Sequence, residues 1–210
     1  MSIKLKNYIK EDNNKISKDK LLKHLKKILF GRTNNMNNLN IKLLSDNATT
    51  PTRAYGVSAG LDIYAAETVV IEPQEKILLA TDIAVDIPEG YVGLLTSRSG
   101  VSSKTHLVVE TGKIDAGYNG HVKVNIKNDK DISNEEPTKA VLNGERAYSL
   151  LGVSGESIGF STNMNCYQIN KGDKIAQLVI TPIVTPEVNV VEEFESESIR
   201  GTNGFGSSGY

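Results

Sequence analysis

Several features that assign a protein to a class are scarce in this sequence. Cys166 is the only cysteine among 210 residues, so no intrachain disulfide can form, which fits a reducing compartment. No histidine stands near it in sequence, and we interpret it as a buried structural thiol. No run approaches the roughly 18 apolar residues of a membrane span, and the N-terminus lacks the apolar core of a secretory signal. We therefore expect a cytoplasmic protein without membrane contact.

The main part of the chain, after residue 35, also lacks an excess of basic residues. The formal net charge is -1, but residues 1–35 hold ten Lys or Arg and three Asp or Glu, whereas the remaining residues hold 14 and 22. The first segment thus carries +7 and the rest carries -8. Because phosphate contacts along a polymer need a basic face, the acidic body argues against a nucleic-acid polymer as the ligand. It leaves room for a small anion held by a few placed groups.

The basic N-terminal extension, residues 1–38, is rich in Lys and Asn. Ser17 can cap a helix there that Gly31 would end. Such a basic amphipathic helix can bind a membrane surface or an acidic partner. A solvated appendage is the plainer alternative, and an upstream extension is another, since Met36 could itself start translation. We leave the segment out of the mechanism. The apolar face of the predicted helix would consist of Leu21, Leu22, Leu25, Ile28 and Leu29.

From residue 39 the pattern changes to short strands separated by turn residues. Ile83, Val85 and Ile87 alternate with polar or small residues, and runs of about five residues recur between Gly, Pro and Asn. This spacing predicts an all-β barrel or sandwich over residues 39–198. Residues 129–165 interrupt this regular spacing of strands, which predicts an insert there, partly ordered at 140–142 and 149–153. A glycine-rich tail, residues 199–210, cannot fold alone.

Two polar segments between predicted strands carry groups suited to phosphate chemistry. Arg98, Ser99 and Gly100 offer a guanidinium, a hydroxyl and a backbone amide, which phosphate oxygens bind. Asp115 stands in a turn shortly before Tyr118, and the flanking alternation predicts a hairpin that presents both at its bend. A carboxylate in reach of a water can activate it to attack phosphorus, although a single turn aspartate is more often structural. Tyr118 could stack on a sugar or pack in the core.

Asp62 lies between apolar residues in AGLDIYAA, residues 59–66. Its burial would require a partner or a cation. A carboxylate can hold Mg²⁺ directly or through water, and magnesium accompanies triphosphates. A strand-end aspartate bonded to backbone amides is the equal alternative. No cluster has zinc spacing, and we interpret the three histidines as structural or solvated.

The tail RGTNGFGSSGY is not a Walker loop, because no Gly-Lys-Ser/Thr follows its glycines. Its parts suit a closing lid, in which Arg200 meets a terminal phosphate and Phe205 stacks on a base. Ser207 and Ser208 add hydrogen-bonding groups. A flexible low-complexity tail would account for the glycines and serines but not for Arg200 and Phe205.

Five segments in this order resemble the motifs of the trimeric dUTP diphosphatase (dUTPase) family. One such motif would be weak evidence, but five in sequence over residues 59–209 are specific. The presence of an insert between the third and fourth motifs is similar to dUTPases of staphylococcal phages, which would place the protein in the cytoplasm of a bacterial host. The segments are AGLDIYAA (59–66), TSRSGVSSK (96–104), GKIDAGYNG (112–120), GDKIAQLVI (172–180) and RGTNGFGSSG (200–209).

The resemblance implies a distorted jelly-roll β-barrel and a homotrimer whose three active sites each use motifs of all three subunits. C-terminal arm exchange would carry the tail of one subunit to a neighbour's site. The implied reaction hydrolyses dUTP to dUMP and pyrophosphate, which limits uracil incorporation into DNA. Asp115 would activate the water that attacks the α-phosphorus, and Asp62 would hold Mg²⁺ through its water shell.

The resemblance also implies how the nucleotide is bound. The segment from Gly112 to Tyr118 would offer backbone groups to the uracil edge and reject the thymine methyl, while Tyr118 would exclude a 2′-hydroxyl. Arg200 would meet the γ-phosphate and Phe205 would cover the uracil, expelling water. The full implied set is Arg98, Ser99 and Gly100 on the phosphates, Gln177 beside them, Gly112, Ile114 and Tyr118 at the nucleoside, and Arg200, Phe205, Gly206 and Ser207 in the lid.

Two alternatives to a simple dUTPase stay open. Similar phage enzymes bind repressors of mobile pathogenicity islands, so the insert and the tail could form a protein-binding surface on a nucleotide-sensing regulator. The related dCTP deaminase shares the fold. The lid with Phe205 and the GKIDAGY segment favour the diphosphatase over the deaminase.

Overall fold

The computed structural model describes residues 38–132, 138, 140–194 and 201. The chain divides into two compact units, residues 1–39 and 40–210. The helix predicted in the N-terminal extension lies outside the described residues. So do four predicted lid residues, Arg200, Phe205, Gly206 and Ser207. Within the described part of the chain, no helix is long and apolar enough to cross a membrane.

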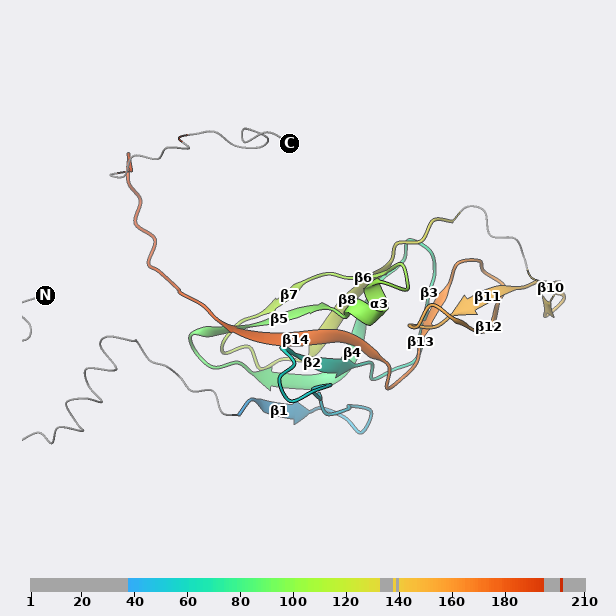
Figure 1. The fold of residues 1–210 in the computed structure, drawn as a ribbon, viewed down its shortest axis with the longest axis horizontal. Coiled ribbons are helices and arrows are strands. Elements are labelled where there is room, and N and C mark those ends of the chain that lie inside the picture. Colours follow the sequence, from blue (N-terminus) through green and yellow to red (C-terminus); the bar gives the residue numbers. More distant parts are fainter. Residues whose placement is uncertain (1–37, 133–137, 139, 195–200, 202–210) are drawn as a thin grey trace, which may run out of the picture. The chain divides into compact units, whose positions relative to one another are not determined.

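Almost all of the regular secondary structure in the described part of the second unit is β-strand, which confirms the all-β prediction (Figure 1). Three sheets have four strands each, in the orders β1-β4-β8-β6, β2-β14-β5-β7 and β12-β11-β13-β3, and β10 pairs with β9. The elements are β1 (Asn40–Leu43), β2 (Gly60–Tyr64), β3 (Val69–Ile71), β4 (Lys76–Asp86), β5 (Tyr91–Ser97), α3 (Ser99–Ser102), β6 (Leu107–Val109), β7 (Gly112–Ile114), β8 (Val122–Asn128), β9 (Val141–Leu142), β10 (Glu145–Arg146), β11 (Tyr148–Leu151), β12 (Ser157–Ser161), β13 (Tyr167–Ile169) and β14 (Lys174–Pro182).

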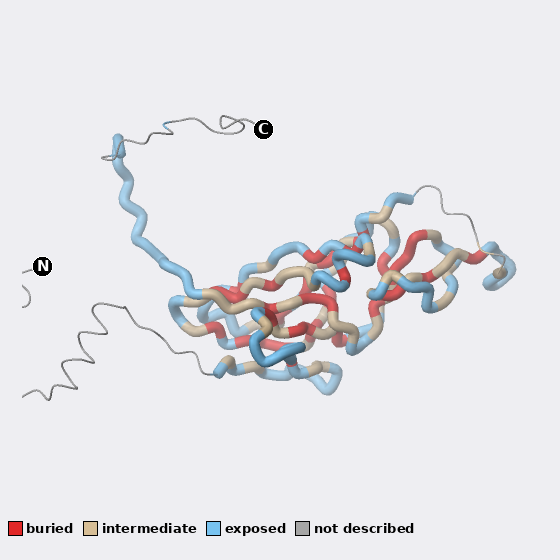
Figure 2. The backbone as a smooth tube through the Cα atoms, in the orientation of Figure 1, coloured by how far each residue is buried: buried red, intermediate tan, exposed pale blue. Residues whose placement is uncertain are grey.

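The core follows from the alternation of side chains along the strands. In β8, Val122, Val124 and Ile126 are buried, while Lys123 between them is exposed. Successive side chains of a strand point to opposite faces, so this pattern gives one apolar face and one polar face. Buried positions run along the strands of all three larger sheets (Figure 2). Cys166 belongs to this core and is fully buried, as predicted for a structural thiol.

A bulge bends the long strand β4. Its pairing with β8 shifts between Ala80 and Ile83, and Asp82 has a φ of 52°. At the bulge the Thr81 hydroxyl donates to the Val122 carbonyl, and the Asp82 backbone N–H donates to His121 Nε2 at 2.9 Å. A bulge of this kind turns a strand and re-aims its neighbours. The bulge also holds His121, the residue that precedes β8, in position.

The prediction of a hairpin around Asp115 is wrong. β7 pairs with β5, whereas β8 pairs with β4 and β6, so residues 115–121 connect two different sheets. The turn itself is present, since the Tyr118 N–H donates to the Asp115 carbonyl at 3.2 Å and Gly117 has a φ of 84°. Turn residues specify a reversal of the chain, but they do not specify which strand each arm will pair with.

The predicted insert contains four strands, β9 to β12. Asn143 and Gly144 have φ values of 53° and 86°, as a two-residue hairpin of the mirror-image type requires. β11 joins the body because Leu151 pairs in parallel with Tyr167 of β13. The buried Asn128 amide donates to Asn165 O at 2.9 Å and so ties the two ends of the insert together. The insert is therefore attached to the same sheet as β3 and β13.

Candidate functional site

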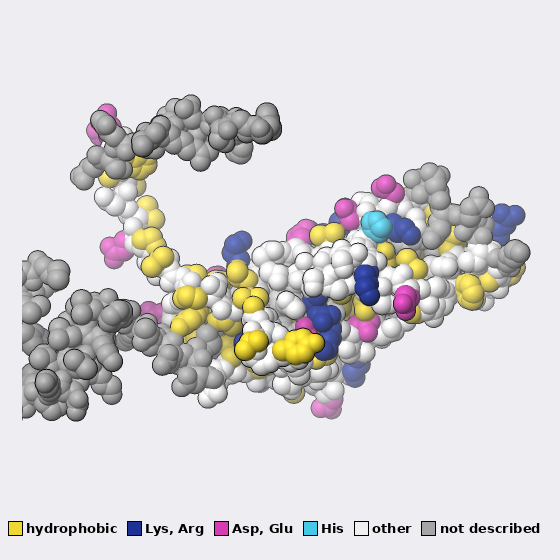
Figure 3. All heavy atoms as spheres, in the orientation of Figure 1, with side chains coloured by type: hydrophobic (Ala, Val, Ile, Leu, Met, Phe, Trp, Pro, Cys, Tyr) yellow, Lys and Arg dark blue, Asp and Glu magenta, His cyan; other side chains and the backbone are white. Residues whose placement is uncertain are grey.

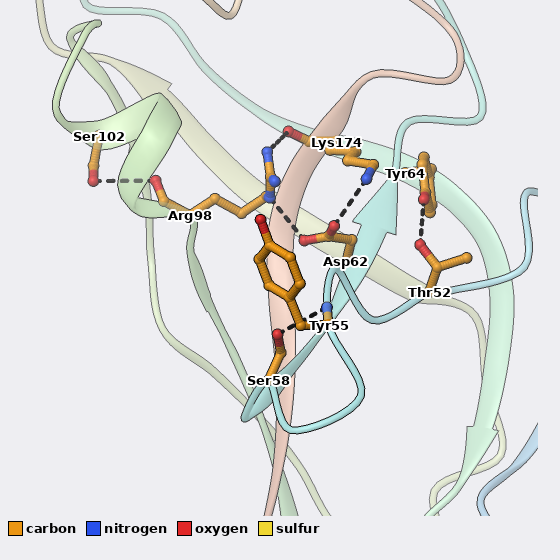
Figure 4. Close-up of polar contacts among 8 residues, drawn as sticks. All are labelled: Thr52, Tyr55, Ser58, Asp62, Tyr64, Arg98, Ser102 and Lys174. Carbon is orange, nitrogen blue, oxygen red and sulfur yellow. Dashed lines mark hydrogen bonds and ion pairs between the residues drawn. The ribbon is translucent and has the colours of Figure 1, made fainter.

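Asp62 is a charged side chain that the fold buries. It lies on β2, directly opposite Gln177 of β14, and is only 1% exposed. Arg98 Nε donates to Asp62 Oδ1 at 2.9 Å, and the Lys174 ammonium lies 3.1 Å from Oδ2 as an ion pair (Figure 4). An unpaired buried carboxylate would be costly, so these two cations are what permits its burial.

The same two cations set the ionisation of Asp62. Burial favours the neutral acid, but the contacts with Lys174 and Arg98 outweigh burial and hold the pKa of Asp62 below its usual range. In return, the Asp62 carboxylate raises the pKa of Lys174. Near neutral pH the cluster therefore holds one carboxylate and two cations, with a net charge of +1. That sign suits a phosphate group.

Arg98 is held in place by three contacts. Besides its bond to Asp62, its Nη1 donates to the Lys174 carbonyl at 3.2 Å, and its own carbonyl accepts from the Ser102 hydroxyl at 3.1 Å. A guanidinium has five N–H donors, so two such bonds leave capacity for phosphate oxygens. Ser99 and Gly100 follow directly at the start of α3 and are exposed.

Lys174 was not among the residues predicted from the sequence. Lys174 is the first residue of β14, which pairs with the strand that carries Asp62. Its contact with Asp62 therefore depends on strand pairing, which the sequence alone does not show. Figure 3 shows Lys and Arg side chains gathered near the middle of the drawn face, and Figure 4 shows that the exposed Tyr55 ring points toward Arg98.

Gln177 is brought to the same cluster. It pairs with Asp62 on one side and Thr96 on the other, so the three side chains share one face of the sheet. A Cβ built at Gly60 would lie 3.0 Å from Gln177 Oε1, which shows how closely the Gln177 side chain lies over β2. The structure therefore brings three of the predicted site residues, Asp62, Arg98 and Gln177, close to one another.

A second candidate site is a cavity of about 320 Å³ beside β7. It contains Gly112, Ile114 and Tyr118, the three residues predicted to contact the nucleoside. Tyr118 is 49% exposed and its hydroxyl donates to the His121 carbonyl at 3.2 Å. Asp115 lies in the adjoining turn and is exposed. The cavity is lined by Leu95, Gly112, Lys113, Ile114, Tyr118, His121, Val122 and Lys123.

One chain does not bring Asp115 and Arg98 together. Gly93 pairs with Ile114, so Asp115 stands level with Val92, whereas Arg98 lies six residues further along the extended chain of β5. At about 3.3 Å per residue this separation is roughly 20 Å. The phosphorus atoms of a triphosphate span far less. Asp115 and Arg98 of the same chain therefore cannot serve the same phosphate group.

Within the described ranges, no group of three or more His, Cys, Asp and Glu side chains could hold a metal ion. Asp62 is a lone carboxylate whose Oδ2 accepts no hydrogen bond in good geometry. A lone carboxylate does not make a protein cage, but it fits an ion such as Mg²⁺ that keeps its waters and is held mainly by substrate phosphates. Lys174 would compete with such an ion for Oδ2.

We expect Asp62→Asn to lower the free energy of unfolding by about 1–3 kcal/mol at pH 7, because it leaves Arg98 and Lys174 without their counter-charge in a partly exposed cluster. The folded-state pKa of Asp62 is below its unfolded value of about 3.9, so its contribution is present above that value and is lost as the pH falls through the folded pKa. Urea unfolding at pH 7 and at lower pH values measures this.

The gap between wild type and Asp62→Asn should therefore shrink in acid. A gap that stays constant from neutral pH into strong acid would contradict this account. Asp46→Asn, at an exposed turn residue, is the matched control and should change stability little at either pH. Protein concentration is held fixed, because association would shift the unfolding midpoint.

Comparison with known proteins identifies the family of this chain. A family model for dUTPase matches residues 46–136 and 158–209. The probable deoxyuridine 5′-triphosphate nucleotidohydrolase of Schizosaccharomyces pombe is 36% identical over 169 residues, which cover 80% of this chain and 96% of that protein.

Solved structures extend the likeness to the fold. The dUTPase of Staphylococcus bacteriophage 80alpha with dUpNHpp matches with a TM-score of 0.74 and 56% identity, covering 83% of this chain and 99% of that one. The dUTPase from phage phi11 of S. aureus matches with a TM-score of 0.68 and 57% identity, covering 77% and 100%. These likenesses support the jelly-roll β fold expected from the sequence. The chain belongs to the dUTPase family and is a dUTP diphosphatase.

Proposed function

We propose that Asp115 is the general base of this dUTPase and activates the water that attacks the α-phosphorus of dUTP, giving dUMP and pyrophosphate and so limiting uracil incorporation into DNA. The observation that carries this proposal is the cavity beside β7, with Asp115 in the turn next to it. The Tyr118 N–H fixes the turn by donating to the Asp115 carbonyl. A base must lie within hydrogen-bond reach of its water, and this turn can place it there.

The cavity suits a pyrimidine nucleoside. Its volume of about 320 Å³ is at the small end of ligand pockets. The backbones of Gly112 and Ile114 supply N–H donors and C=O acceptors for the uracil edge, because both kinds of group occur along the edge of a strand. A narrow pocket rejects the thymine methyl, and the Tyr118 ring leaves no room for a 2′-hydroxyl. In this way the site would distinguish dUTP from dTTP and UTP.

The phosphates would bind the charged cluster of another subunit. Arg98, Ser99 and Gly100 lie roughly 20 Å from Asp115 along β5, so a complete site needs Asp115 from one chain and Arg98 from a second. Closed symmetric association supplies such pairs three times in a homotrimer. Gln177 lies beside Asp62 and would help to place a phosphate or the water.

Mg²⁺ fits beside Asp62, held through its water shell and by the phosphates. When bound it would neutralise the triphosphate and the departing pyrophosphate. The dUTPase of phage phi11 contains a structural Mg(II) ion. Arg98 and Lys174 add positive charge at the same place, so the cation and these side chains would share the negative charge of the phosphates.

The C-terminal arm would complete a neighbouring subunit. After Ile183, whose N–H donates to the Gly90 carbonyl at 2.9 Å, the described chain up to residue 194 has no assigned strand, and Val184, Val188 and Val190 are more than 90% exposed. A run of exposed apolar side chains of this kind marks an interaction site. Arm exchange would bury it and bring Arg200 to the γ-phosphate and Phe205 over the uracil, with Gly206 and Ser207 closing the lid.

Asp115→Asn should reduce pyrophosphate release from dUTP by about 10²–10⁴-fold, because the amide keeps the shape but cannot accept the proton. Binding of dUpNHpp should remain within a few-fold. Release of pyrophosphate from dUTP, dTTP, dCTP and UTP, measured in parallel, tests substrate choice at the same time. Rapid turnover by the variant would exclude Asp115 as the base, and a preference for dCTP would exclude the proposed substrate.

Mixed trimers test whether each site uses two chains. Asp115→Asn and Arg98→Gln are each expected to be inactive alone. After unfolding and refolding together in equal amounts, about one quarter of the sites should combine an intact Asp115 with an intact Arg98 from another chain, so about one quarter of the wild-type rate should return. Size-exclusion chromatography checks that both variants assemble. A mixture no more active than its components would show that each site belongs to one chain.

A second function is favoured by the surface of the insert. Val141, Ile158 and Phe160 are 68%, 48% and 53% exposed, on strands that none of the five motifs includes. The phage 80alpha dUTPases control transfer of virulence genes, and the phi11 dUTPase has a species-specific insert. We therefore propose that this insert, with the tail, binds a repressor of a mobile pathogenicity island.

Val141→Ser with Phe160→Ser should weaken binding to such a repressor by at least tenfold, because exposed aromatic and aliphatic anchors dominate protein interfaces. Turnover of dUTP should change little, since these side chains lie outside the nucleotide site. Val70→Ser, at an exposed position outside the insert, is the control. Titration of the repressor by calorimetry and a parallel pyrophosphate assay give the two readouts. Unchanged repressor binding would contradict a role for this surface.

A further inference from the structure

Gly120 occupies the place over which the Tyr118 ring folds back. A Cβ built at Gly120 would lie 2.5 Å from Tyr118 Oη, 2.6 Å from Cζ and 2.9 Å from Cε2. Each distance is shorter than real Cβ contacts, so an added methyl group and this ring cannot both keep their positions. The φ of Gly120 lies outside the left-handed region. Left-handed backbone strain therefore does not oppose alanine here, and the three nearest atoms that its methyl group would meet all belong to the Tyr118 side chain.

The far end of the ring is held on a second side. The Tyr118 hydroxyl donates to the His121 carbonyl at 3.2 Å. His121 is itself fixed by the β4 bulge, because its Nε2 accepts the Asp82 backbone N–H at 2.9 Å and lies 3.3 Å from the Asp82 carboxylate. The Tyr118 ring thus lies between Gly120 and the His121 carbonyl, and the bulge in β4 holds His121 in position.

These contacts with Gly120 and His121 determine the position of the Tyr118 ring in the cavity beside β7. Tyr118 and His121 both line that cavity, and Tyr118 remains about half exposed. A ring about half exposed has little packing of its own to fix it. We propose that Gly120 is a positioning residue for substrate choice: by leaving room for the Tyr118 ring, it sets how strongly this dUTPase prefers dUTP over UTP. This rests on the proposed role of Tyr118 at the sugar.

Gly120→Ala tests the proposal through a selectivity ratio. A pocket that rejects an added hydroxyl by shape alone discriminates by about 10²-fold, so displacement of the ring should lower the ratio of kcat/KM for dUTP over UTP by about tenfold. The loss should arise mainly from better use of UTP. Because the methyl meets the end of a flexible side chain, the unfolding midpoint should shift by less than about 4 °C. Gly56→Ala, where a Cβ meets nothing within 4 Å, should leave the ratio and the midpoint unchanged.

A double-mutant cycle with Tyr118→Ala shows whether the ring transmits the effect. Tyr118→Ala should itself lower the ratio, and adding Gly120→Ala should then change it no further, because the group that the methyl displaces is gone. A ratio unchanged by Gly120→Ala, or one lowered equally in the Tyr118→Ala background, would overturn the inference. If Tyr118→Ala leaves the ratio unchanged, the role of Tyr118 at the sugar fails, and the inference fails with it.

Discussion

The extended geometry of β5 constrains everything that this chain does with a nucleotide. The proposed phosphate-binding segment lies at one end of the strand, where Arg98 follows Ser97. The middle of the strand, Gly93 to Leu95, pairs with β7, which runs toward the other end and leads into Asp115. A paired strand cannot bend back on itself, since each residue adds about 3.3 Å. The two halves of the proposed chemistry are therefore kept apart by the hydrogen bonds that make the sheet. Association of identical chains is the simplest way to bring them together.

The buried carboxylate of Asp62 holds the two cations of the proposed phosphate end, Arg98 and Lys174, in place. Arg98 and Lys174 come from segments 76 positions apart in sequence, and the carboxylate holds both. Since two cations share one anion, the cluster keeps a net positive charge while its guanidinium is already oriented. A phosphate binding there would not have to organise a flexible arginine, which lowers the entropic cost of binding. Stability and the proposed phosphate binding therefore depend on the same three side chains.

Sequence alone predicted the features that local pattern encodes. The alternation at Ile83, Val85 and Ile87 predicted strands. The family motifs predicted that Arg98 and Asp62 both act at the triphosphate, Arg98 directly and Asp62 through Mg²⁺. The sequence could not predict that β7 pairs with β5 rather than with β8, because a turn such as Asp115–Tyr118 does not specify its partners. It also missed Lys174, whose contact with Asp62 depends on a pairing between strands more than 100 residues apart. Pairing over such distances is a property of the whole fold.

Besides its pairing with β13, the insert contacts the segment that follows the proposed phosphate-binding residues. A Cβ at Gly155, in the turn between β11 and β12, would lie 2.3 Å from the Lys104 carbonyl, and Gly155 has a φ of 79°. The turn therefore contacts the backbone that continues α3, only a few residues beyond Arg98. Gly155 and Lys104 are not buried, so this is a surface contact. A side chain at residue 155 would have to displace the Lys104 backbone, so this close approach requires glycine there.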